Sequence, residues 1–138
     1  MSKRSISVLV SNVLLIAAIP LFAHHGNAVF DPAKKVTLQG TVTEWYWSNP
    51  HCLLLFDVKS DGGQMKRWIG ETQNPAVMVD GGWSRVSFKP GDQVTVTLQP
   101  VKTGKPLGRI LTVALPNGKT LNALAGTPDG GKTVSDQK

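Results

Sequence analysis

Hydrophobic and polar residues alternate along much of the chain after residue 35, which is the pattern of strands that bury one face. These stretches are rich in Val, Thr, Leu and aromatic residues, and clusters of Gly, Pro, Asp and Asn separate them. The pattern predicts five strands, in the ranges 36–47, 51–59, 64–72, 93–101 and 109–115. No internal repeat or heptad pattern interrupts this reading.

The first predicted strand changes its alternation partway along. Apolar residues keep one parity as far as Val42, whereas Trp45 and Trp47 have the other. Side chains alternate between the two faces of a strand, so this change predicts a β-bulge near Thr43 or Glu44.

The second predicted strand separates two residues that have reactive side chains. Alternation places Cys52 on the core face with the apolar residues at 54, 56 and 58, and His51 on the opposite face with Asp57. The following turn, "SDGGQ", predicts a hairpin in which Asp61, Gly62 and Gly63 have positive φ.

A short helix is predicted between the third and fourth strands. Asn74 can cap it, Pro75 suits its first turn, "AVMVD" forms its body, and Gly81 and Gly82 end it. Three strands, one helix and two more strands follow the element order of an OB-fold, a five-stranded Greek-key barrel. We therefore expect an all-β, OB-fold-like domain over residues 24–121 and a disordered tail, rich in Gly, Thr, Lys and Asp, over 122–138.

The first 23 residues have the layout of a secretory signal peptide. Lys3 and Arg4 precede an apolar stretch, residues 6–19, and the segment closes on "LFA". This stretch is shorter than the roughly 20 residues that a membrane-spanning helix needs. The sequence thus predicts export to the periplasm or the exterior, with cleavage after Ala23 or, alternatively, after Ala28.

Composition narrows the function classes further. The 115 residues after the leader suit a single domain. Without Lys3 and Arg4, 13 of the 15 basic residues remain against 9 acidic ones, a net charge of +4 with no polybasic run. An exported chain of this kind does not point to nucleic acid, and an envelope protein or a small ligand is the expected partner class. Cys52 is the single cysteine, so an internal disulfide is excluded.

Several motifs together resemble a known family. They are "AHHG" after the leader, "FD" shortly after it, "GTVTEWYWSNPH", Trp68 with Glu71, "GGW" and "KPGDQVTV". In order and spacing this set is similar to the small exported bacterial family catalogued as domain of unknown function 6152, over residues 23–121. The resemblance implies an exported β-rich domain and supplies no activity.

Carried over by this resemblance, the family's histidine pair corresponds to His24 and His25, and its Asn-Pro-His to residues 49–51. Two positions depart from the family pattern. Tyr46 stands where a carboxylate is frequent, and Cys52 stands where a small apolar residue is usual.

Cleavage after Ala23 would make His24 the amino-terminal residue, which is an unusual metal ligand. Its free amine and its ring nitrogen can bind one metal ion together, and His51 or His25 can add a further nitrogen. This histidine-brace arrangement favours Cu(II), whereas Zn(II) prefers tetrahedral closure by another ligand. Cys52 is a poorer candidate because its parity buries it. The alternative is that the histidines are merely exposed and that His51 hydrogen-bonds its turn.

A second candidate is a binding site that uses no metal. Trp45, Trp47 and Trp68 are expected in the core or at the barrel mouth, where some could stack on a ligand beside Asp57 and Glu71. Such a site would suit a peptide, a glycan or an envelope partner.

Catalytic motifs are weaker. No nucleophile elbow surrounds Ser48, and "GTPDGGKT" lacks the strand and helix of a phosphate loop. The sequence therefore favours a non-enzymatic protein and names no catalytic residue.

Overall fold

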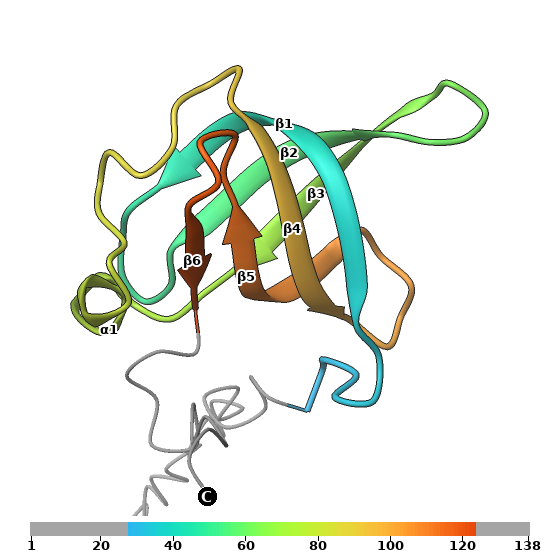
Figure 1. The fold of residues 1–138 in the computed structure, drawn as a ribbon. Coiled ribbons are helices and arrows are strands. Elements are labelled where there is room, and N and C mark those ends of the chain that lie inside the picture. Colours follow the sequence, from blue (N-terminus) through green and yellow to red (C-terminus); the bar gives the residue numbers. More distant parts are fainter. Residues whose placement is uncertain (1–27, 124–138) are drawn as a thin grey trace, which may run out of the picture.

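The computed structural model describes residues 28–123, which form a small barrel with a short helix at one end (Figure 1). The elements along the chain are β1 (Val36–Tyr46), β2 (Leu53–Lys59), β3 (Met65–Glu71), α1 (Pro75–Asp80), β4 (Gln93–Pro100), β5 (Leu107–Ala114) and β6 (Thr120–Asn122). No helix in this described part of the chain has the length and apolarity needed to cross a membrane.

The sheet closes on itself between β3 and β5. Its strand order is β3-β2-β1-β4-β5-β6, with antiparallel neighbours, and β3 pairs in parallel with β5 from Ile69 opposite Leu107 to Glu71 opposite Arg109. Five strands thus form a closed mixed barrel, with the helix between the third and fourth strands. The predicted OB-fold-like barrel is confirmed.

Local features also agree with the sequence pattern. The register between β1 and β2 shifts between Val42 and Glu44, which is the predicted bulge. The Asn74 side chain accepts a hydrogen bond from the Val77 amide at 3.2 Å and caps α1 as expected. In the β2–β3 hairpin only Gly63 has a positive φ, 79°, so the positive φ expected of Asp61 and Gly62 is wrong.

A sixth strand is the main departure from the predicted elements. Residues 120–122 pair with β5, Leu121 is 2% exposed, and the Ala123 amide donates to Leu111 O at 2.8 Å. Asn122 and Ala123 therefore belong to the packed domain, although their composition favoured the tail. A three-residue strand carries one inward side chain, which is too short for a detectable alternation.

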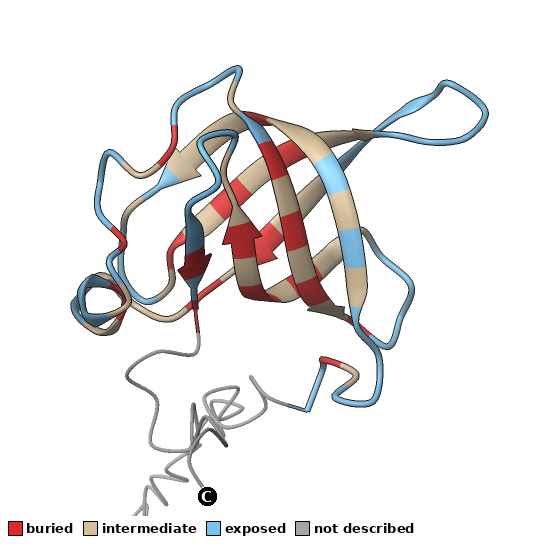
Figure 2. Ribbon diagram, in the orientation of Figure 1, coloured by how far each residue is buried: buried red, intermediate tan, exposed pale blue. Residues whose placement is uncertain are grey.

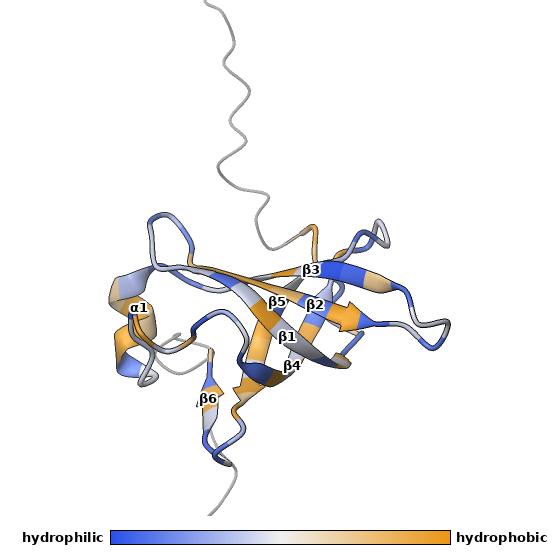
Figure 3. Ribbon diagram, turned by 90° about the horizontal axis from the view of Figure 1, so that it is seen from above, coloured by the Kyte–Doolittle hydropathy of each residue, from blue (hydrophilic) through white to orange (hydrophobic). Residues whose placement is uncertain are grey.

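The core fills the inside of the barrel, where buried residues alternate along β2 and β4 (Figure 2). Hydrophilic residues gather at the start of β3 and in the connecting loops (Figure 3). The largest fully buried side chains are Trp83, Phe56, Leu54, Met78, Leu98 and Ile110.

Two glycines meet where the barrel closes. Gly70 of β3 is the register partner of Gly108 of β5. A Cβ on Gly70 would lie 2.5 Å from Ile110 Cδ1, and a Cβ on Gly108 would lie 2.4 Å from Leu98 Cδ1. Real Cβ atoms essentially never make contacts this short, so the closure requires residues without side chains.

Candidate functional site

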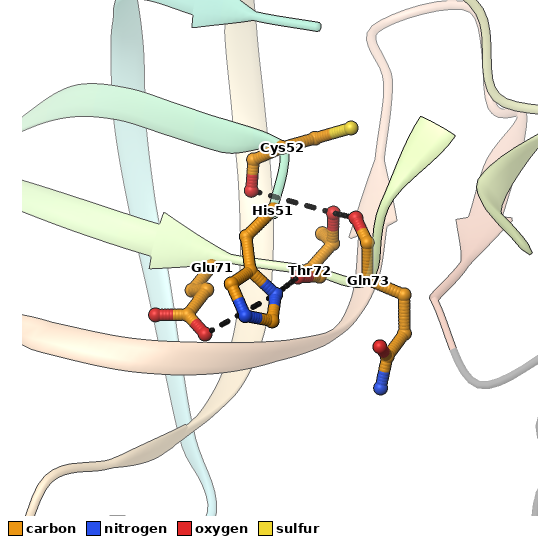
Figure 4. Close-up of polar contacts among 5 residues, drawn as sticks. All are labelled: His51, Cys52, Glu71, Thr72 and Gln73. Carbon is orange, nitrogen blue, oxygen red and sulfur yellow. Dashed lines mark hydrogen bonds and ion pairs between the residues drawn. The ribbon is translucent and has the colours of Figure 1, made fainter. Parts of the chain in front are cut away.

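His51 lies just before β2, in a segment held by backbone hydrogen bonds on its carboxyl side. The Cys52 amide donates to Gln73 O at 3.1 Å, and the Thr72 amide donates to Cys52 O at 3.0 Å. Figure 4 shows the Thr72 hydroxyl between the carbonyl oxygens of Cys52 and Gln73. The pairing of β2 with β3 therefore continues past both strand ends. This pairing fixes the backbone from which the His51 ring projects.

A backbone carbonyl orients the His51 ring. His51 Nδ1 lies 2.9 Å from Thr72 O, and a carbonyl oxygen can only accept a hydrogen bond. This contact therefore selects, of the two neutral tautomers, the one with hydrogen on Nδ1, in which Nε2 has a free lone pair. The side chain is 43% exposed, so the ring is both held in place and open to solvent.

Glu71 supports the same ring. Its carboxylate oxygen Oε1 lies 3.5 Å from His51 Nδ1, and its side chain is 25% exposed. A carboxylate beside one ring nitrogen stabilises an imidazole that bears positive charge, whether from a proton or from a metal on the other nitrogen. Thr72, which supplies the carbonyl oxygen beside His51 Nδ1, is buried, and its hydroxyl donates to Gln73 O at 3.0 Å.

The amino-terminal end of the described chain lies beside the end of β4 and the start of β5. Phe30 forms an antiparallel bridge with Val101 and is 3% exposed, and the Arg109 guanidinium lies 4.7 Å from the centre of its ring. Arg109 is the register partner of Glu71 across the barrel closure. Four residues therefore follow one another across the outside of the barrel, in the order His51, Glu71, Arg109 and Phe30.

Asp57 lies on the predicted outer face but far from His51. Six residues of extended strand separate the two, which corresponds to about 20 Å. Asp57 accepts two hydrogen bonds from Arg67, at 2.9 and 3.2 Å, and these bonds together with the charge of Arg67 lower the pKa of the Asp57 carboxyl. The structure thus brings Glu71 to His51 and leaves Asp57 in a separate ion pair.

Cys52 points into the core, as its parity predicted. Its side chain is fully buried beside Leu54 and Phe56 in the core cluster, and this burial raises the pKa of the thiol. A buried protonated thiol is a poor metal ligand because metal binding requires the thiolate.

Three of the tryptophans pack together at the end of the barrel that carries α1 (Figure 1). The Trp45 ring packs against Trp47, Trp83 and Phe88 with centroid distances of 5.8, 5.8 and 5.1 Å. The indole N–H of Trp45 donates to Ser84 O, and that of Trp83 donates to Asn122 O, both at 3.0 Å. Trp68 is half-buried and also packs against the core. These contacts explain the rings through packing, without a bound ligand.

An open groove of about 480 Å³ lies at the other end of β2 from His51. Amide, hydroxyl and charged side chains line it, together with Met65, Leu115 and Pro116. The polar members are Gln39, Thr41, Asp57, Lys59, Gln93 and Thr95. Sequence reasoning missed this groove because its walls come from five strands that only the barrel brings together.

His24 and His25 lie outside the described residues, so the predicted metal set is seen here through His51 alone. Within residues 28–123, no three His, Cys, Asp or Glu side chains gather as a metal-binding group. Sequence reasoning named His51 and Glu71 and missed Thr72, Arg109 and Phe30. The "FD" motif at residues 30 and 31 was the one sequence signal for the last of these.

Together these features define a small OB-type β-barrel with a carbonyl-oriented histidine on its outer rim. The chain belongs to the family of unknown function DUF6152, whose model matches residues 12–110. Comparison with curated proteins gave no match.

Proposed function

We propose that this protein is an exported copper-binding protein of the bacterial envelope. Its Cu(II) site would consist of the amine and ring nitrogen of His24 and the Nε2 atom of His51, with His25 as the alternative third ligand. The observation that carries this proposal is the hydrogen bond from His51 Nδ1 to Thr72 O, which leaves Nε2 free on an exposed ring. Metal-binding histidines usually have such a partner on the second nitrogen.

The path of the chain supports the pairing of His24 with His51. His24 lies six positions before Phe30, a length of chain that can span about 20 Å when extended. Phe30 contacts Arg109, whose register partner Glu71 contacts His51. Adjacent strands are about 4.8 Å apart, so this length of chain suffices to reach the His51 ring.

The chemistry of the ligand set favours copper. Three nitrogen donors in a plane suit Cu(II), which also has the highest affinity in the divalent series. The amine has an ordinary pKa near 8 and must lose its proton to bind, so affinity should rise with pH up to about 8. Such a site could serve copper storage, copper delivery or redox chemistry.

A metal-free binding module is the second candidate, and the polar groove favours it. The groove presents both donors and acceptors, from Gln39, Lys59 and Gln93 among others, which suits a hydroxyl-rich ligand such as a glycan. With this function the protein would bind no copper. Binding of its ligand would depend on residues at the opposite end of β2 from His51.

The mature mass is the first test. Isolation from the envelope fraction of a bacterial host, followed by intact-mass measurement, should give a chain that starts at His24. A chain that starts at Val29 would lack the chelating terminus and would contradict the copper site.

Copper titration of the mature chain is the second test. Cu(II) should bind with one-to-one stoichiometry and give a paramagnetic resonance spectrum of several nitrogen ligands. His24→Ala and His51→Ala should each lower the affinity at least about 10-fold and change the nitrogen hyperfine pattern. A chain with one extra residue before His24 should lose affinity too, because its amine is displaced from the ring.

Asp57→Asn is the matched control, since Asp57 lies on the same face at the far end of β2. It should bind copper like the wild type. Spectra of His24→Ala and His51→Ala that equal the wild-type spectrum would reject the site and favour the metal-free module. A change confined to His25→Ala would assign the third nitrogen to His25.

A further inference from the structure

Two backbone hydrogen bonds and a buried ring hold the Val29–Asp31 segment on the barrel. The Lys102 amide donates to Val29 O at 3.0 Å, and the Asp31 amide donates to Pro100 O at 2.8 Å. Between these two hydrogen bonds the Phe30 ring is 3% exposed, although it lies outside the main core cluster. Its burial must therefore come from contacts on the outside of the barrel.

Arg109 provides one of these contacts and links Phe30 to the candidate site. Its guanidinium lies 4.7 Å from the centre of the Phe30 ring, a distance typical of a cation–π interaction. Arg109 is the register partner of Glu71 in the β3–β5 pairing, and the separate pairing of β2 with β3 brings Glu71 Oε1 within 3.5 Å of His51 Nδ1. One arginine thus lies between the docked segment and the histidine.

We infer that Phe30 and Arg109 form a clasp that positions the amino-terminal segment for metal binding at His51. This inference rests on the proposed copper function and assigns two positioning residues that do not touch the metal. Docking at Phe30 leaves a shorter stretch of chain, residues 24–28, to be ordered when a metal binds both His24 and His51. Binding then costs less conformational entropy than it would from a free tether.

The clasp can be tested first without copper, by amide hydrogen exchange. Phe30→Ala should lower the protection of the Asp31 and Lys102 amides at least about 10-fold, because both amides bond across the bridge that the ring anchors. Arg109→Met should lower it between about 3-fold and 30-fold, the range of a cation–π contact. Protection of the Val96 amide in β4 should stay unchanged and show that the barrel is intact.

Copper binding then separates positioning from simple stability. Phe30→Ala should weaken Cu(II) binding about 10-fold and shift the resonance spectrum towards that of His51→Ala. Phe30→Tyr, which keeps a ring for Arg109, should restore both properties. Val29→Ala, a change at the adjacent 46% exposed residue, and Arg85→Met, a change at an exposed arginine after α1, are the matched controls and should behave like the wild type.

Equal copper affinity and equal spectra in Phe30→Ala and Val29→Ala would overturn the clasp while leaving the copper site standing. Undiminished protection of the Asp31 and Lys102 amides in Phe30→Ala would overturn it as well. A wild-type chain that starts at His24 and binds no Cu(II) would instead reject the proposed function, and with it the positioning role.

Discussion

Gly108→Ala should destabilise the barrel at its point of closure. The added Cβ would lie 2.4 Å from Leu98 Cδ1 and 2.8 Å from the backbone oxygen of Gln99. The Leu98 side chain can rotate away, but the Gln99 oxygen belongs to the strand that pairs with Gly108's own strand and cannot move freely. The clash must therefore separate β4 from β5 locally or distort the β3–β5 pairing.

The size of the effect follows from two opposing terms. Overpacking of a well-packed interior costs about 1–3 kcal/mol. Replacing a strand glycine by alanine returns about 0.5–1 kcal/mol, because the unfolded chain loses conformational freedom. With the middle of each range, the net loss is about 1 kcal/mol, which lowers the Tm of a domain of this size by about 4–8 °C.

Thermal unfolding followed by far-UV circular dichroism, with urea unfolding as a second measure, tests this estimate. Gly62→Ala is the matched control, since its nearest neighbour beyond the adjoining residues is Ser60 Oγ at 4.0 Å and its φ is not positive. Gly62→Ala should leave the Tm unchanged or slightly raised. A Tm for Gly108→Ala equal to that of Gly62→Ala would refute the reasoning that the barrel closure requires glycine at position 108.

Three further predictions concern side chains whose surroundings are defined. Asp57→Asn should lower stability slightly at neutral pH: Arg67 depresses the pKa of Asp57 in the folded state, so the pair contributes fully above the ordinary pKa near 3.9, and the difference from wild type should vanish as the pH falls below it; a constant difference down to pH 2 would contradict this. The Cys52 thiol, buried and with a raised pKa, should react with iodoacetamide at pH 8 at least about 100-fold more slowly in the folded chain than in urea, and equal rates would place it at the surface. Asn74→Ala should lower the free energy of unfolding in urea by about 1 kcal/mol because it removes the cap of α1. Ala76→Ser, a change at an exposed residue two positions further on, should lower it by less than half of that, and equal losses would reject the capping role.

Alternation and turn chemistry predicted much of the fold because both act between residues close in sequence. The period of the pattern predicted five strands, the bulge between Val42 and Glu44 and the inward face of Cys52. Capping chemistry predicted the role of Asn74. The element order then restricted the topology to few choices, and the OB-type order proved correct.

The candidate site was predicted only in part, for a physical reason that its members illustrate. Parity placed His51 on the outer face, and the third strand carried Glu71 at its end, but neither fact says that the two side chains meet. Their contact depends on the register of β2 with β3, which aligns Leu53 with Glu71. Asp57 shares the same face and parity, yet the same register gives it Arg67 as partner instead.

Sequence alone determined the five barrel strands, the helix, the outward face of His51 and the family, because these depend on local periodicity and on motifs that can be read in order. It did not reveal β6. Tertiary structure decided which residues from distant strands become neighbours. It brought Thr72 O to His51 Nδ1, set Gly70 against Gly108, and carried Phe30 to Arg109. Such contacts arise when the barrel closes, and no pattern within one strand encodes the partner that closure supplies.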